Sequence, residues 1–397
     1  MPDELRVLGS PPPRGGPARA EDLPLAVQAL AALAAGPEGG PPDALIAGGL
    51  AAVILGPALL GEPATAARRT AAMQAAALHS PTGAPLLVGA PAQLGRLCRL
   101  PAGHSVLPGP LALAASGRLD LARQAGRALA GQLAALGVAW CLGPDGEDCF
   151  TPAVEAALTS GLQDGGVPAG LRLRPPDGAD GPAPLVVASL PPGGRGEAAV
   201  QALLGGAQLL LVSGAEEAEL AARAVVAAAE AGRLPRALLA EAVSRVLACK
   251  RQWGLARRPL PDPEAVPHLL ARPSDAHLAA AIGGAAVTEL CSGAPVPAPV
   301  RLEASPATPE PLLAAAIRRW PAGSVSRAGA GPWLSLDGSC HLLLLPPLPG
   351  TLPAGRVLAA YDAVPASLQA LLEAAAGLAA APGRLPLPRP ASWAGQA

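Results

Sequence analysis

Lysine and aromatic residues are almost absent from this chain. Lys250 is the only lysine, and Trp, Tyr and Phe together make up 2% of the residues. Alanine and leucine must therefore fill the core. The net charge of -1 provides no basic surface for nucleic acid or for an anionic membrane, so we expect neither as a partner. Low net charge with 51% hydrophobic residues also excludes a wholly disordered chain.

Motifs for metals, nucleotides and membrane insertion are also missing. The six cysteines form no CxxC pair and have no metal-type spacing to the five histidines, so no metal site is expected. No GxGxxG or P-loop occurs, so no cofactor is expected. The longest uncharged run, residues 44–61, is broken by glycine and proline, and its apolar core is too short to span a bilayer. The N-terminus lacks the pattern of a secretory signal, which together with unpaired cysteines predicts a cytoplasmic protein.

The segment 205–255 has the clearest pattern in the chain. Residues 207–212 are apolar and are bounded by glycine and serine, which predicts a buried strand. Acidic residues at 216, 217 and 219 then favour the start of a helix, because they complement its dipole. A second helix follows Pro235 and ends before Gly254, with Lys250 and Arg251 in its last turn.

The same alternation of strands and helices continues on the N-terminal side. Strand-like runs occur at 50–55, 85–88, 138–142, 171–174 and 185–189, and helices are predicted at 23–35, 64–78, 119–136 and 154–162. Such alternation predicts βα units and a parallel sheet. About six strand-like runs precede residue 215, whereas a closed (β/α)₈ barrel needs eight strands.

Composition divides the chain into four parts. Residues 1–20 form a Pro/Gly/Arg tail that we expect to be disordered, and 259–274 is a proline-rich linker. Between them, 21–258 is expected to be a TIM-barrel-like domain, closed or incomplete. Residues 275–397 are expected to form a smaller α/β sandwich domain, with a helix at 276–290, strands at 341–345 and 357–361, and a helix at 365–378.

Three passages resemble glycoside hydrolase family 3, most strongly its bacterial β-N-acetylhexosaminidase branch. The first joins GGAQLLLVSG to AGRLPRALLAEAVSRVLACKRQWGL, and the second is GRLDLARQAGRALAGQLAALGVAWCLGPDGED. The third, GRVLAAYDAVPASLQALLEAAAGLAAAPGRLPLPRP, resembles the end of the family's second domain. The resemblance implies a barrel whose active site lies at the C-terminal ends of the strands. It also implies retaining chemistry with a carboxylate nucleophile and a proton donor.

Two sugar-binding motifs of the family are altered. The motif that usually reads DQEGGRVQRL matches residues 91–100, where Pro91 replaces the aspartate and Arg99 matches an arginine used near the sugar. The resemblance therefore makes Arg99 the candidate substrate-binding residue. In the GDRSF-like motif, Asp148 stands at the position of a substrate-contacting arginine, which reverses the charge.

The catalytic positions of the family are altered as well. The KHFPGHGD motif matches residues 172–179, where Asp177 and Ala179 replace the His–Asp pair that transfers the proton. The nucleophile's strand matches 186–190 and places Ser189 at the position of the aspartate. Serine cannot replace a carboxylate in forming the glycosyl intermediate, so no catalytic residue is assigned. The segment between Asp177 and Leu185 is also too short for the family's next βα unit.

Two functions remain open on these residues. The first is a catalytically inactive homologue that binds a glycan, such as an amino sugar, or a protein. The second is an active glycosidase with relocated carboxylates, for which Asp145 and Asp177 are candidates because they follow predicted strands. The missing carboxylate at Ser189 favours the first.

Overall fold

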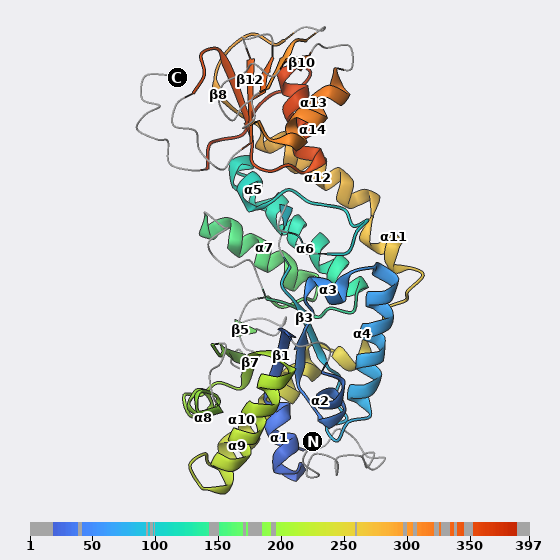
Figure 1. Cartoon of the computed structure of the whole chain (residues 1–397), viewed down its shortest axis with the longest axis vertical. Helices are drawn as coiled ribbons and strands as arrows, with labels where there is room; N and C mark the ends of the chain where they lie inside the picture. The colour runs from blue at the N-terminus through green and yellow to red at the C-terminus, as the bar shows by residue number, and fades with distance from the viewer. Residues whose placement is uncertain are drawn as a thin grey trace.

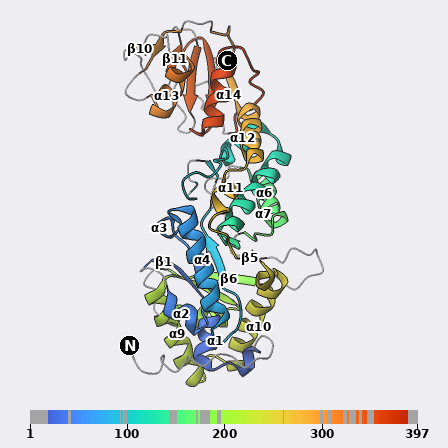
Figure 2. The same cartoon turned by 90° about the vertical axis from the view of Figure 1, so that its right-hand side faces the viewer.

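The computed structural model has two sheets in an elongated molecule (Figures 1 and 2). The seven-stranded sheet and its helices form the lower part in Figure 1, helices α5–α7 the middle, and the six-stranded sheet the top. The structure describes residues 19–38, 42–92, 94–95, 98, 100–142, 151–169, 172–173, 185–191, 196–258, 260–296, 300–304, 308–320, 325–326, 334–336, 340–344 and 352–386. Residues 1–18 of the predicted tail lie outside this set.

The first sheet confirms the predicted TIM-barrel-like α/β fold. Its spatial order is β4-β3-β2-β1-β7-β6-β5, and all neighbouring strands are parallel except β5 and β6. The strands are β1 (Leu33–Glu38), β2 (Ala52–Ile54), β3 (Leu87–Ala90), β4 (Trp140–Cys141), β5 (Arg172–Leu173), β6 (Leu185–Ser189) and β7 (Leu209–Gly214). Pairing of β7 with β1 curls the sheet, since the last parallel strand lies beside the first.

Helices separate these strands and cover the outer face of the sheet. They are α1 (Leu25–Ala31), α2 (Asp43–Gly48), α3 (Pro57–Leu60), α4 (Pro63–Leu78), α5 (Pro110–Ser116), α6 (Leu119–Ala135), α7 (Pro152–Asp164), α8 (Gly196–Leu204), α9 (Ala215–Glu230) and α10 (Arg236–Gln252), with 3₁₀ turns at Ala20–Asp22 and Leu255–Arg257. Several begin with proline in the first turn, where its missing N–H costs no hydrogen bond.

The sequence prediction was wrong about the start of the sheet. A single helix was expected over 23–35, but α1 ends at Ala31 and β1 begins at Leu33. Alanine-rich runs favour helix, yet burial between β2 and β7 decides the outcome, because β1 is the central strand of the sheet. In the second domain the helix expected over 276–290 likewise ends at Ala286, and residues 288–291 form a strand.

Side chains alternate between two cores along the strands, as a pleated sheet requires. Residues such as Leu210 point outward into the large cluster beneath the helices, which also holds Val243 and Leu247 of α10. Inward-facing residues form a second cluster in the concave side of the sheet, and the end of α10 contributes to it with Trp253. The predicted burial of Leu210, Val243 and Leu247 is confirmed, whereas Leu211 faces inward and is half-buried.

The seam between β4 and β6 differs from a regular barrel. The amide of Cys141 in β4 donates to the Pro168 carbonyl at 2.9 Å, and Cys141 also forms a parallel bridge with Ala169. A few residues later, β5 pairs with β6 in the antiparallel direction. One short segment therefore contacts both edges of the curled sheet, where a (β/α)₈ barrel would have further parallel strands.

The C-terminal part folds around a mixed six-stranded sheet of order β10-β9-β11-β12-β13-β8. Helices α12 and α14 pack against each other beside this sheet. The elements are α11 (Val266–Leu270), α12 (Pro273–Ala286), β8 (Thr288–Cys291), β9 (Leu302–Glu303), α13 (Glu310–Arg319), β10 (Val325–Ser326), β11 (Leu334–Leu336), β12 (Cys340–Leu344), β13 (Arg356–Ala360) and α14 (Pro365–Ala375). This arrangement confirms a second, smaller α/β domain.

The expected linker at 259–274 contains the short helix α11, which packs on α4 and α6. We propose that the division between the domains falls in this stretch. Helix α12 then contacts both α5 and α14, so it connects the two parts of the molecule.

Two neighbouring glycines of α12 give a matched test of this packing. A Cβ atom on Gly283 would lie 2.8 Å from the carbonyl oxygen of Ala366, whereas a Cβ on Gly284 would meet nothing within 4 Å. We expect Gly283→Ala to destabilise the protein by about 1–3 kcal/mol through overpacking. Gly284→Ala should stabilise it by roughly 0.5–1 kcal/mol, because alanine favours a helix over glycine. Denaturant unfolding of both variants checks the contact, and equal effects would contradict it.

Candidate functional site

The carboxyl ends of the parallel strands form one rim of the curled sheet, which we call the C-terminal rim. Because β1, β2, β3, β4, β6 and β7 run in one direction, their last residues lie at this rim: Glu38, Ile54, Ala90, Cys141, Ser189 and Gly214. In barrel enzymes this is where the chemistry takes place. The rim is therefore the candidate site.

Ser189 occupies the end of β6 at this rim. It shares the face of the strand with Leu185 and Val187, both of which belong to the inner cluster, so alternation places its side chain on the concave side. Unlike those residues it is exposed. Register pairing with Leu211 of β7 and a 2.8 Å hydrogen bond from the Leu190 amide to the Leu211 carbonyl fix its backbone.

The floor beneath the rim is closed by a fully buried tryptophan. Trp140 of β4 belongs to the inner cluster with Ile54 of β2. Gly89 of β3 leaves room for both, since a Cβ atom there would lie 2.6 Å from Ile54 Cδ1 and 3.0 Å from Trp140 Cε3. The strand ends thus surround an apolar base. A ligand at the rim would contact the residues that follow the strands.

Of the other site residues predicted from the sequence, one lies at the rim and the rest lie outside the described residues. Pro91, which the resemblance aligns with the family's aspartate, directly follows β3 and is exposed at the rim. Arg99, Asp145, Asp148, Asp177 and Ala179 lie outside the described residues. Of the predicted positions, the structure therefore places only Ser189 and Pro91 at this rim.

The sequence prediction missed one carboxylate at the rim, that of Glu38. It is the last residue of β1, it is exposed, and it pairs in register with Gly214 of β7. Among the described strands of the first sheet, no other residue is acidic. Glu38 was overlooked because β1 was taken for helix; the Gly-Pro-Glu sequence that follows the apolar run was the available signal.

A second acid lies close to the end of β7. Glu217, in the first turn of α9, accepts a 3.4 Å hydrogen bond from the Ser213 amide, so its carboxylate lies beside the end of β7. Within the described part of the chain, no group of three or more His, Cys, Asp or Glu residues is arranged to hold a metal ion.

The loop that follows β3 is attached to the second domain through Asp362. The Gly109 amide donates to Asp362 Oδ2 at 2.7 Å, and the Val364 amide donates to Oδ1 at 3.2 Å. Burial raises the pKa of Asp362, against the opposing effect of these hydrogen bonds. Since both oxygens accept hydrogen bonds from backbone amides, Asp362 holds this loop in position.

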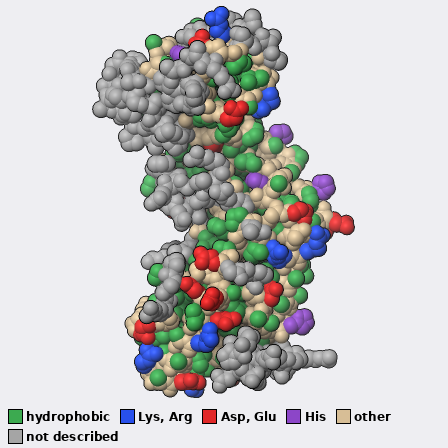
Figure 3. Space-filling model, viewed as in Figure 1, with side chains coloured by type: hydrophobic (Ala, Val, Ile, Leu, Met, Phe, Trp, Pro, Cys, Tyr) green, Lys and Arg blue, Asp and Glu red, His purple; other side chains and the backbone are tan. Residues whose placement is uncertain are grey.

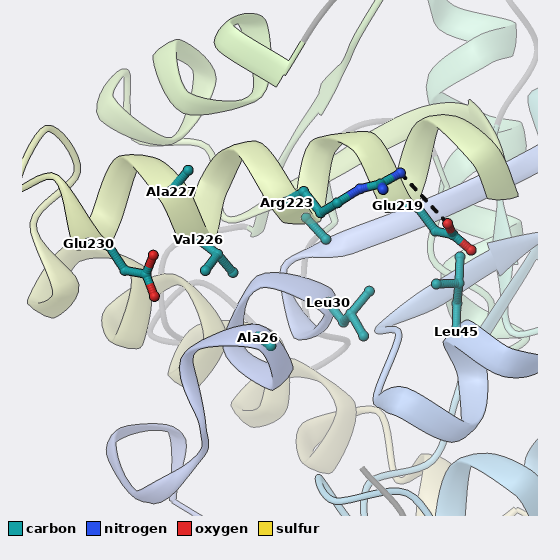
Figure 4. A pocket seen from close by; sticks show the side chains of 9 residues that line it. Ala26, Leu30, Leu45, Glu219, Arg223, Val226, Ala227 and Glu230 are labelled. Carbon is teal, nitrogen blue, oxygen red and sulfur yellow. Dashed lines mark ion pairs between the residues drawn. The ribbon is translucent and has the colours of Figure 1, made fainter. Parts of the chain in front are cut away.

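Two hollows lie away from the rim. One, of 260 Å³, lies between α1, α2 and α9 (Figure 4). Its walls include Leu30, Leu45 and Val226, and a Glu219–Arg223 ion pair of 3.8 Å crosses one end. A second lies between α13 and α14 beside Arg318 and Arg319. Both are bounded by helices and receive no strand end, so neither is the site that the barrel fold indicates.

Acidic side chains gather in the lower part of the face drawn in Figure 3, over the first sheet and its helices. Such a surface gives no support to binding of nucleic acid. Among the described residues, no helix combines the length and apolar character that a membrane crossing needs.

Comparison with known proteins shows which family this chain resembles in sequence. Residues 29–145 match the model of the glycosyl hydrolase family 3 N-terminal domain. No curated protein matches by sequence. The matched segment runs from α1 through β1–β4, so it includes four of the strands that form the C-terminal rim.

Solved structures share the fold over most of the chain. A glycoside hydrolase family 3 β-N-acetylglucosaminidase from Paenibacillus sp. superposes with a TM-score of 0.68 and 20% identity, covering 92% of this chain and 99% of that one. A fungal multi-domain β-N-acetylglucosaminidase gives 0.68 and 16%, covering 93% and 61%. The β-glucoside phosphorylase BglX gives 0.67 and 13%, covering 97% and 98%. The predicted resemblance is thus confirmed: residues 29–145 match the family's N-terminal domain, and the fold of the similar structures extends over most of this chain.

Proposed function

We propose that this protein is a glycoside hydrolase family 3 homologue that binds an amino-sugar glycan at the C-terminal rim without hydrolysing it. The observation that carries the proposal is Ser189. It is exposed on the concave side at the end of β6, and the resemblance aligns it with the family's carboxylate nucleophile. A serine hydroxyl there can donate and accept hydrogen bonds to a sugar, but it cannot form the glycosyl ester of the retaining route.

The class of ligand is inferred from the resemblance and from two similar structures. Both the Paenibacillus and the fungal structure are described as β-N-acetylglucosaminidases. Arg99, which matches a sugar-contacting arginine of the family, would supply charged donors for the ligand. We also keep the cytoplasmic location as part of the proposal, because the spacing of the six cysteines gives no disulfide pattern.

Glycan binding can be tested by NMR titration with N-acetylglucosamine and its short β-linked oligomers. We expect Ser189→Trp to abolish binding by blocking the rim, and Arg99→Ala to weaken it by about tenfold, as for loss of a charge-assisted hydrogen bond. Val186→Trp is the matched control, since Val186 is exposed on the same strand but near its opposite end. Absence of binding, or equal binding by the Ser189→Trp variant, would refute the proposed ligand site.

Glu38 favours a second candidate function, an active glycosidase with a relocated carboxylate. It lies at the correct rim and is exposed, and Glu217 is on the helix that follows the neighbouring strand. Asp145 and Asp177 remain candidates from the sequence alone. If this function holds, Glu38→Gln, Asp145→Asn or Asp177→Asn should abolish a turnover that the unmodified protein shows. Glu216→Gln, one residue from Glu217 on the same helix, serves as the control.

A further inference from the structure

A third hollow lies at the opposite end of the curled sheet from the C-terminal rim. It has a volume of 460 Å³, within the range of small-molecule sites. Its walls come from the segments that lead into β3 and β4, from the turn after α7 and from residues 255–261 after α10. It is therefore separate from the proposed glycan site, and a ligand in it would bind whether or not the rim binds glycan.

Arg258 is the only charged residue among the described residues that line this hollow. Its Nη2 donates to the Gly166 carbonyl at 2.6 Å and more weakly to the Trp253 carbonyl at 3.4 Å. Within the described part of the chain, Nε and Nη1 form no hydrogen bond, and no carboxylate pairs with the guanidinium. Burial lowers the pKa of Arg258, with no opposing negative charge, but an arginine remains protonated.

A partly buried cation in proteins is ordinarily paired with an anion. Here the two backbone carbonyls bind Nη2 and orient the guanidinium, which leaves the separate N–H groups of Nε and Nη1 unused. Each of these N–H groups can donate one charge-assisted hydrogen bond to a carboxylate oxygen. One positive charge balances one negative charge, so a monoanion fits better than a doubly charged phosphate.

The rest of the hollow is apolar. Leu78 and Leu260 line it with exposed fractions of 45% and 56%, and they are among the most exposed large hydrophobic residues described. The Gln74 amide, the one other polar side chain among the described lining residues, is already used: it donates to the Leu86 carbonyl at 2.7 Å and accepts from the Leu86 amide at 3.0 Å. The walls thus offer one cationic group and an apolar surface.

From these observations we propose that the hollow binds a small monocarboxylate with an apolar chain. The carboxylate accepts a hydrogen bond from Nη1 of Arg258, and the chain covers Leu78 and Leu260. Such a ligand would stabilise the folded protein by binding only to it, and it would connect the segment after α10 with the end of α4.

Calorimetric titration of the full chain with hexanoate tests this site, with hexanamide and inorganic phosphate as comparison ligands. We expect hexanoate to bind and hexanamide and phosphate to bind at least tenfold more weakly, because only hexanoate offers both the charge and the chain. Arg258→Gln should weaken hexanoate binding by about tenfold to a hundredfold. Arg257→Gln is the matched control: Arg257 is exposed, lies next in the chain and does not line the hollow.

A second variant keeps the test valid if Arg258→Gln folds poorly. Ala256→Trp fills the hollow from an exposed position and leaves Arg258 in place, so it should also abolish binding. The proposal is overturned if hexanoate does not bind at millimolar concentration, if hexanamide binds equally well, or if both blocking variants retain full affinity. Equal or tighter binding of phosphate would contradict the choice of a monocarboxylate.

Discussion

Replacing Lys250 with methionine is expected to stabilise this protein at neutral pH by roughly 4 kcal/mol. Lys250 is 4% exposed near the end of α10, and burial without a compensating charge lowers its pKa from 10.5 to about 7. The unfolded chain keeps the ordinary pKa, so the unfolded state binds the proton more tightly than the folded state does. Methionine has a similar length and removes the cost of burying an ammonium group.

The pH dependence of this effect follows from the two pKa values. Because the pKa of Lys250 is lowered in the folded state, its unfavourable contribution is complete below about pH 7 and is relieved as the pH rises to 10.5. The stability difference between Lys250→Met and the unmodified protein should therefore be constant below pH 7 and decrease steadily above it. Burial raises the pKa of Cys340 to about 11 and of Tyr361 to about 12, which destabilises both proteins equally above about pH 9.

Urea unfolding between pH 6 and pH 10 measures this difference directly. Lys250→Arg is the matched control, since arginine cannot lose its proton and should be less stable than the unmodified protein at every pH. Arg251→Met, at the exposed neighbouring position, should change stability by no more than about 0.5 kcal/mol. A pH-independent difference would show that Lys250 stays charged in the folded protein.

The second large effect is expected for Leu247→Ala in the same helix. Leu247 is 4% exposed and belongs to the large core cluster between the sheet and its helices. Truncation should cost about 2–5 kcal/mol, because the buried side chain leaves a cavity that rigid neighbours fill only in part. Leu220→Ala in α9 is the control, since that leucine is 50% exposed and should lose far less. Equal thermal melts for the two variants would reject the assigned packing of α10.

The fold could be predicted from sequence wherever the spacing of the apolar residues agrees with the positions of the residues that end helices and strands. The strand 185–189 was expected at the limits it has in the structure, and α4, α6 and α10 were found because their apolar residues recur at helical spacing. The strand β1 was missed because its alanines look helical in isolation. Only its position between two other strands makes an extended conformation favourable, and no local pattern contains that information.

The candidate site was predicted only in part for the same reason. Alignment of the strand 185–189 identified Ser189, and the structure places it at the rim. Glu38 was missed together with its strand, because it is the last residue of β1. The sites at Lys250 and Arg258 could not be predicted, because a basic last turn ordinarily indicates exposed charges that complement a helix dipole. Their burial depends on how α10 ends against the sheet.

The most direct test of the central claim is the initial rate of hydrolysis of aryl β-N-acetylglucosaminides by the unmodified protein. We predict a rate indistinguishable from that of buffer, because Ser189 cannot form the covalent intermediate. Ser189→Asp, measured beside it, asks whether the remaining scaffold can support chemistry once a carboxylate is restored. Robust turnover by the unmodified protein, lost in Glu38→Gln, Asp145→Asn or Asp177→Asn, would contradict the account and identify the relocated carboxylate.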